Sequence, residues 1–189
     1  MPTRLPAVTK PVTPTAPSVV APPAGESSQL TPQDLYLFNE GSHVRLYEKL
    51  GSHPMVVDGV EGFQFAVWAP NAETVSVIGD FNGWDARSHR MATADGAGVW
   101  VLFIPGVKPG VCYKYRITAR FSGYRVDKTD PFAFTTEIAP KSAAVTWDMK
   151  YQWNDAAWMK ARGAKMKHDA PVSIYELHLG SWKIGRAHV

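Results

Sequence analysis

Between residues 60 and 147 the sequence contains short segments in which apolar and polar residues alternate, and this pattern constrains the fold more than any other feature. In the first segment Phe63, Phe65 and Val67 fall on one side, and the intervening residues fall on the other. A period of two is typical of a β-strand with one face buried. Further segments of this kind are 74–78, 99–104, 113–119, 124–128 and 143–147. Turn-forming pairs, such as Asn82-Gly83 and Pro105-Gly106, separate them.

Strands spaced this closely, with no helical segment between them, predict an all-β fold. We expect an immunoglobulin-like antiparallel β-sandwich over residues 60–147. A helix longer than about ten residues within this window would contradict the prediction. The residues expected to be largely buried in the sandwich are Phe65, Val67, Val75, Val77, Val101, Tyr115 and Ile117.

The first 59 residues divide into two parts. Eight of the 15 prolines lie within the first 32 residues, and residues 1–30 contain no aromatic side chain. Such a segment cannot bury enough apolar surface to offset its chain entropy, so we expect a disordered leader over residues 1–30. Residues 31–59 are expected to be a short helical lead-in. Thr31 is a good helix cap, Pro32 suits the first helical position, and Gly41 is expected to end the helix.

The pattern changes again after residue 147. Residues 148–171 mix aromatic and basic side chains and are expected to be a solvated linker. Residues 172–177 are nearly continuously apolar, as in a strand of a buried parallel sheet, yet few residues follow that could pair with such a strand. We therefore expect an orphan strand that is incompletely buried.

Composition excludes several classes of function. The 20 basic residues only slightly outnumber the 17 acidic ones and are scattered, which argues against a nucleic-acid partner. No apolar run approaches the roughly 20 residues needed to cross a bilayer, so no membrane association is expected. Cys112 is the single cysteine, which excludes an internal disulfide and fits a reducing, cytoplasmic location.

The polar residues predict no catalytic or metal centre. The carboxylates stand singly in turns, as at Asp80 and Asp85, where aspartate commonly bonds to the backbone. Glycoside hydrolysis needs two carboxylates on opposite sides of one bond, and the spacing provides no such pair. The six histidines lack metal-ligand spacing. We therefore expect no catalytic residue, no metal and no cofactor in this chain.

Aromatic residues give a clearer signal. The segment 79–85, Gly-Asp-Phe-Asn-Gly-Trp-Asp, places Trp84 in a polar turn just after a strand. A tryptophan in that position can stack on the apolar face of a pyranose ring; alternatively, it packs down over the end of the sandwich. Lys114 falls on the polar face of segment 113–119, from which an ammonium can donate to sugar hydroxyls.

Several motifs together resemble the glycogen (1,4-alpha-glucan) branching enzymes of bacteria. FNEGSHVRLYEKLGSHP (38–54), FAVWAPNAETVSVIGDFNGWD (65–85), GVWVLFIPGV (98–107), YKY (113–115) and DPFAF (130–134) are similar to the amino-terminal sandwich of that family. That sandwich is a carbohydrate-binding module of family 48. SIYELHLGSW (173–182) is similar to the first strand of the family's catalytic barrel, which belongs to glycoside hydrolase family 13.

The resemblance implies a parent enzyme that cuts an α-1,4-glucan and transfers the cut chain to a 6-hydroxyl without a cofactor. Its aspartate and glutamate catalysts lie on late barrel strands, so no residue of this chain inherits either role. Residues 172–183 would be the start of the barrel, the intramolecular partner of the sandwich. Residues 184–189 depart from the family and are expected to be a non-native tail.

The resemblance also implies which residues bind an α-glucan. Trp84 and Lys114 correspond to positions that contact glucan in some relatives, and Tyr124 lies roughly where relatives offer a second aromatic residue. Two alternatives remain open. The chain could be a free-standing glycan-binding regulatory module, like the sandwich in energy-sensing kinase subunits, or a piece of a debranching or trehalose-releasing relative.

Overall fold

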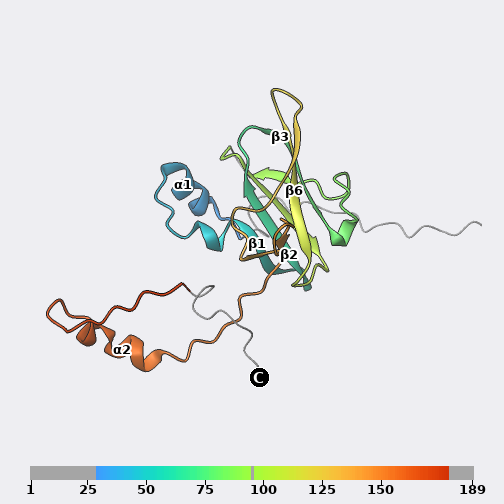
Figure 1. The fold of residues 1–189 in the computed structure, drawn as a ribbon. Helices are drawn as coiled ribbons and strands as arrows, with labels where there is room; N and C mark the ends of the chain where they lie inside the picture. Colours follow the sequence, from blue (N-terminus) through green and yellow to red (C-terminus); the bar gives the residue numbers. More distant parts are fainter. Residues whose placement is uncertain (1–28, 95, 179–189) are drawn as a thin grey trace, which may run out of the picture. The chain divides into compact units, whose positions relative to one another are not determined.

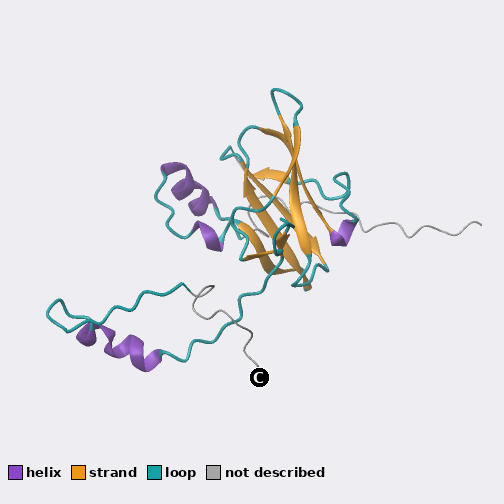
Figure 2. Ribbon diagram, viewed as in Figure 1, coloured by secondary structure: helices purple, strands orange, loops and turns teal. Residues whose placement is uncertain are grey.

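Two antiparallel β-sheets pack face to face in the first of two structural units, residues 1–149 (Figures 1 and 2). The computed structural model describes residues 29–94 and 96–178. The first sheet has the order β1 (Gly51–Val57), β2 (Val60–Trp68), β5 (Val99–Pro105), β4 (Ala92–Ala94). The second has the order β3 (Ala72–Gly79), β6 (Cys112–Ala119), β9 (Ala144–Val145), β8 (Thr135–Thr136), and β7 (Arg125–Lys128) also pairs with β6. The predicted all-β sandwich is confirmed.

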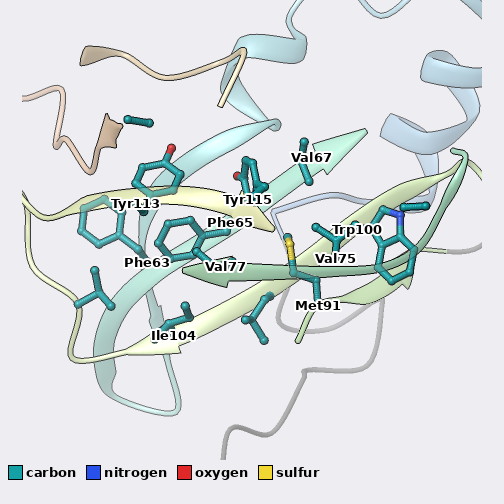
Figure 3. Packing of buried hydrophobic residues seen from close by; sticks show 14 residues of the cluster. Phe63, Phe65, Val67, Val75, Val77, Met91, Trp100, Ile104, Tyr113 and Tyr115 are labelled. Carbon is teal, nitrogen blue, oxygen red and sulfur yellow. The ribbon is translucent and has the colours of Figure 1, made fainter. Parts of the chain in front are cut away.

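The main core lies between the two sheets and is built from the inward-facing residues of their central strands (Figure 3). Phe65 and Tyr115 are completely buried, and the rings of Phe65 and Tyr113 meet edge to face at 5.0 Å. The predicted core residues Phe65, Val67, Val75, Val77 and Tyr115 are all buried. Ile117 is only partly buried, although it packs against this core.

Val101 differs from its predicted place between the sheets. It pairs with Ala66 across β5 and β2, and both residues face away from the second sheet. Because side chains alternate along a strand, Val101 belongs to the outer face, where it is partly buried in a second apolar cluster.

The second cluster forms where residues 29–50 cover the outer face of the first sheet. Helix α1 (Pro32–Glu40) begins as predicted: the Thr31 hydroxyl accepts from the Asp34 amide at 3.1 Å, and Asp34 accepts from the Thr31 amide at 2.8 Å. It ends at Gly41, which has a φ of 82°. Leu30, expected to belong to the leader, is 4% exposed, so the fold begins before residue 31. The rest of that expected leader, residues 1–28, lies outside the described residues.

Strand β1 occupies a region expected to be helical. The lead-in predicted over 31–59 is helical only in its first part, and residues 51–57 pair with β2 along their whole length. Two features conceal this strand in the sequence. Pro54 interrupts it, which is tolerated because β1 lies at a sheet edge, and the polar residues Ser52 and His53 are buried. Strands β4 and β8, of three and two residues, were not predicted either.

The second unit, residues 150–189, contains helix α2 (Ala156–Lys165) within the expected linker. The strand expected over 172–177 is wrong for this structure, because residues 171–178 form no regular secondary structure. A strand needs a partner, and none is present among the described residues of this unit. The expected exposure is confirmed, since Val172, Ile174 and Tyr175 are 65%, 87% and 69% exposed. Residues 179–189, including the expected non-native tail, are outside the described residues. No helix in the described part of the chain is long and apolar enough to span a membrane.

Candidate functional site

The turn that follows β3 is organised around the side chain of Asn82. Its Oδ1 accepts from the Gly79 amide at 2.9 Å, and its Nδ2 donates to the Val77 carbonyl at 3.0 Å and to the Asp85 carbonyl at 3.3 Å. Nδ2 also lies 2.9 Å from Nδ1 of His89. One amide side chain therefore ties both ends of the turn to the strand, which fixes the position of the residues between them.

Trp84 is presented by this turn. Its backbone has a φ of 63°, and its amide donates to the Gly79 carbonyl at 3.0 Å. The indole Nε1 donates to Oδ1 of Asp80 at 3.1 Å, while 38% of the residue remains exposed. Phe81, by contrast, packs against Phe65 of the core at 6.2 Å between ring centroids. Trp84 therefore has an oriented and accessible ring, as stacking on a sugar requires.

Lys114 lies on the outer face of the second sheet, as predicted. It pairs with Ile78, so it lies at the same end of β3 as the turn that carries Trp84. Its Nζ donates to the Ser142 hydroxyl at 3.0 Å, which draws the ammonium toward the loop before β9. No described contact joins Lys114 to Trp84.

Tyr124 lies at the opposite end of the same sheet. Its carbonyl accepts from the Ala119 amide at 2.8 Å, so it is level with a residue five positions beyond Lys114. At about 3.3 Å per residue, the two positions are roughly 17 Å apart along the strand. The side chain is 63% exposed. The structure therefore does not bring Tyr124 and Lys114 into one compact site.

A depression of about 520 Å³ lies beside Trp84 on this unit. Trp84 is the one predicted site residue that lines it. The remaining lining comes from β3, β6, β7 and the segment after the turn: Glu73, Thr74, Ser76, Asp85, Ala86, Arg87, Arg90, Arg116, Thr118 and Arg125. Composition alone does not predict this group of arginines, because they are scattered in the sequence. The signal that could have found two of them is the polar face of segment 113–119 and its hairpin partner.

Charges around the turn are partly paired. Arg87 binds Asp85 through two nitrogens, with Nη2 2.9 Å from Oδ2, and this hydrogen bonding lowers the pKa of Asp85 to about 2. Burial lowers the pKa of His89 below its usual value. Its Nδ1 is within 3.0 Å of the Ser88 hydroxyl and within hydrogen-bond distance of Asn82 Nδ2. An unprotonated Nδ1 can accept from the Asn82 amide, while the Ser88 hydroxyl donates to the Asp85 carbonyl, so the folded turn favours neutral His89.

A second polar group lies within the sandwich rather than on its face. Asp130 is 4% exposed and accepts from the hydroxyls of Tyr113 and Tyr115 at 2.6 and 3.1 Å. Burial raises the pKa of its carboxyl. Its other oxygen accepts from the Phe132 amide at 2.8 Å, so the group anchors the chain after β7. It has no open surface on which a substrate could bind.

Two carboxylates at or near the depression are held by arginines: Asp85 is paired with Arg87, and Asp127 with Arg116. The described residues contain no group of three histidine, cysteine or acidic side chains placed to hold a metal ion. The arrangement is suited to binding, with one aromatic surface and an adjoining array of hydrogen-bond donors.

Comparison with known proteins identifies the sandwich. Residues 49–133 match the family described as carbohydrate-binding module 48 (isoamylase N-terminal domain). The match begins just before β1 and ends after β7, so it covers most of both sheets.

The similarity to curated proteins extends further along the chain. The 1,4-alpha-glucan branching enzyme GlgB of Synechococcus sp. (strain JA-3-3Ab) is 52% identical over 79% of this chain and 19% of that enzyme. The corresponding enzyme of Rubrobacter xylanophilus is 50% identical over 82% of this chain and 21% of its own length. The chain thus spans about a fifth of the length of these relatives. Among solved structures, pullulanase from Bacillus acidopullulyticus matches with a TM-score of 0.42 and 24% identity, over 53% of this chain and 12% of that chain.

Proposed function

We propose that this module, whose residues 49–133 match the carbohydrate-binding module 48 family, binds an α-glucan on the outer face of its second sheet. The observation that carries the proposal is Trp84, whose indole N–H is held by Asp80 while 38% of the residue stays exposed. An oriented aromatic ring can cover the C–H face of a pyranose with little loss of side-chain freedom on binding.

Lys114 and Tyr124 have separate roles in this proposal. An ammonium has three donors, so Lys114 can keep its bond to Ser142 and still donate to a sugar hydroxyl near Trp84. Tyr124, roughly 17 Å away along the strand, would contact a different glucosyl unit of an extended chain. Trp84 is therefore expected to contribute most to affinity for a short oligosaccharide, and Tyr124 only for a longer one.

The test compares single variants by affinity electrophoresis in gels that contain amylopectin, with maltoheptaose titrations beside them. Trp84→Ala should lower the affinity at least about tenfold, as is usual for loss of a buried aromatic contact. Trp153→Ala is the matched control, because it removes a tryptophan that is 76% exposed and lies in the second unit. Equal migration of the two variants would overturn the assignment of Trp84.

We further infer that the chain is part of a 1,4-alpha-glucan branching enzyme, which transfers an α-1,4-glucan chain to a 6-hydroxyl in the cytoplasm. Support comes from identity of about half over 150 residues, well beyond the 49–133 module. That extent favours this reading over a free-standing regulatory module. Residues 172–183 would then begin the catalytic barrel, and the catalytic carboxylates would lie outside this chain.

Two measurements test this second inference. The purified chain should form no α-1,6 branch points in amylose, as judged by isoamylase digestion of the products. The coding sequence beyond the codon for Lys183 should continue in frame through the rest of a barrel. New branch points above a vector-only control, or a natural stop codon at that position, would contradict it.

A further inference from the structure

Four arginine side chains line the depression beside Trp84. Arg87 and Arg90 come from the segment after the turn, Arg116 from β6 and Arg125 from β7. The sheet register places three of them on one face. Arg90 bridges to Ser76, Ser76 pairs with Arg116, and Arg125 pairs with Thr118 one step further along.

The spacing lets these side chains act together. Neighbouring strands lie about 4.8 Å apart, so the backbones of Arg90 and Arg116 are roughly 10 Å apart with Ser76 between them. A guanidinium reaches farther than half that distance from its Cα. Both can therefore approach one small group held above Ser76. The hydroxyls of Thr74 and Thr118, which pair with each other in the next row, add donors to the lining.

Two of the four arginines are not neutralised. Arg87 is paired with Asp85, and Arg116 with Asp127, whose Oδ2 lies 2.9 Å from its Nη2. Arg90 and Arg125 form no ion pair with the residues that the structure describes. Four arginines and two carboxylates, Glu73 and Asp85, line the depression, and a third carboxylate, Asp127, pairs with Arg116 from outside the lining. The excess positive charge is concentrated on the two arginines whose donors are free.

We propose that this arginine depression binds a phosphate monoester, either carried by an α-glucan or as a free sugar phosphate. A guanidinium presents two parallel N–H donors that match two phosphate oxygens, and a dianion satisfies donors from two arginines at once. Trp84 borders the same depression, so a glucan stacked on it would carry a phosphoryl group on a neighbouring sugar into the depression that the arginines line. This glucan-borne form rests on the proposed function; binding of a free ester does not.

The experiment has two arms and uses the full chain. In the first, affinity electrophoresis compares an α-glucan that carries phosphate monoesters with the same glucan after phosphatase treatment. In the second, glucose 6-phosphate is titrated calorimetrically against glucose. Arg90→Gln and Arg125→Gln each remove one unpaired charge from the depression. Arg120→Gln is the matched control, because it removes the same charge from the β6–β7 connection outside the lining.

Phosphorylation of the glucan should strengthen binding about threefold to tenfold, a range set by charge-assisted hydrogen bonds at a solvated surface. Arg90→Gln and Arg125→Gln should abolish most of this gain, and Arg120→Gln should retain it. Arginine-dependent binding in either arm supports the proposal and identifies the source of the phosphate. If phosphate adds nothing in both arms, or if all three variants lose it equally, the proposal is overturned.

The two proposals can fail separately. If the chain does not bind the dephosphorylated glucan but binds glucose 6-phosphate through Arg125, the proposed glucan site is refuted and the proposed arginine site is kept. A chain that binds both glucans equally and binds glucose 6-phosphate no better than glucose, with loss of both glucans in Trp84→Ala, would refute the arginine site and keep the glucan site.

Discussion

Replacing Asn82 by alanine should both destabilise the first unit and weaken glucan binding. The change removes the acceptor of the Gly79 amide and the donor to the Val77 carbonyl, at 2.9 and 3.0 Å, along with a longer bond to Asp85. The backbone groups at the end of β3 then lose their partners. Trp84 is held by the same turn, so its ring also loses its fixed orientation.

The size of the effect follows from those bonds. A hydrogen bond contributes about 1 kcal/mol net, and Asn82 is only partly buried, so the two close bonds together amount to about 2 kcal/mol. For a unit of this size, that corresponds to a fall of roughly 6–10 °C in the thermal midpoint. The fall would be larger if the freed Gly79 amide found no water.

Circular dichroism melts of the full chain measure this change, with Asn71→Ala as the matched control. Asn71 is exposed in the β2–β3 connection, and only its main-chain carbonyl is engaged, by the Arg120 amide at 3.0 Å. Its replacement should shift the midpoint by no more than about 1 °C. If Asn82→Ala and Asn71→Ala have the same thermal midpoint, the Asn82 side chain does not hold the turn and the reasoning is refuted.

Three further predictions concern pH, the buried carboxylate and the second unit. Because the pKa of His89 is lowered in the folded chain, the stability that His89 contributes is complete at pH values well above 6.5, its ordinary pKa, and is lost as the pH falls below 6.5. A difference in thermal midpoint between the original chain and His89→Gln that stays constant from about pH 8 to 5 would contradict this. Asp130→Ala should cost about 3 kcal/mol in urea unfolding, because the hydroxyls of Tyr113 and Tyr115 lose their acceptor, whereas Tyr115→Phe should cost about 1 kcal/mol. Equal costs would show that the carboxylate is not the acceptor that matters. Ending the chain after Lys150 should raise solubility, since the exposed apolar residues of 172–177 are removed, and should leave the thermal midpoint within about 2 °C of that of the full chain. A large loss of stability would show that the second unit supports the first.

The sandwich was predictable where each strand has one apolar and one polar face. Phe63, Phe65 and Val67 face the main core, as their spacing indicates. β1 was not predictable in the same way, because its polar residues are buried by a distant segment. The His53 ring, for example, meets the Phe134 ring edge to face at 5.5 Å between centroids, across 81 residues of sequence. No local pattern encodes a contact of that range.

The candidate site also has one part that local sequence predicts and one part that it does not. The place of Trp84 in a turn could be predicted because the contacts that hold this turn lie close together in sequence, from Val77 to His89. The arginine depression could not, because Arg90 and Arg125 line it together only through the register of four segments: residue 90 with β3, β3 with β6, and β6 with β7. A shift of one residue in that register would turn either side chain to another face. Residues 172–177 have the composition of a strand, but a strand also needs a neighbouring strand with which to pair, and composition does not show whether one is present.

Residues 29–50 cover the outer face of the first sheet, so they must accompany the sandwich when it is transferred into another protein. The match to the carbohydrate-binding module 48 family starts at residue 49, yet Leu30, Leu35 and Phe38 pack with Val99 on the sheet's outer face, and Lys49 binds Asp34 at 3.1 Å. A gene fusion cut at residue 49 would expose that face and lose the ion pair. The segment to transfer is therefore 29–149, because a cut within 29–50 would uncover the sheet even if Trp84, Lys114 and Tyr124 were all retained.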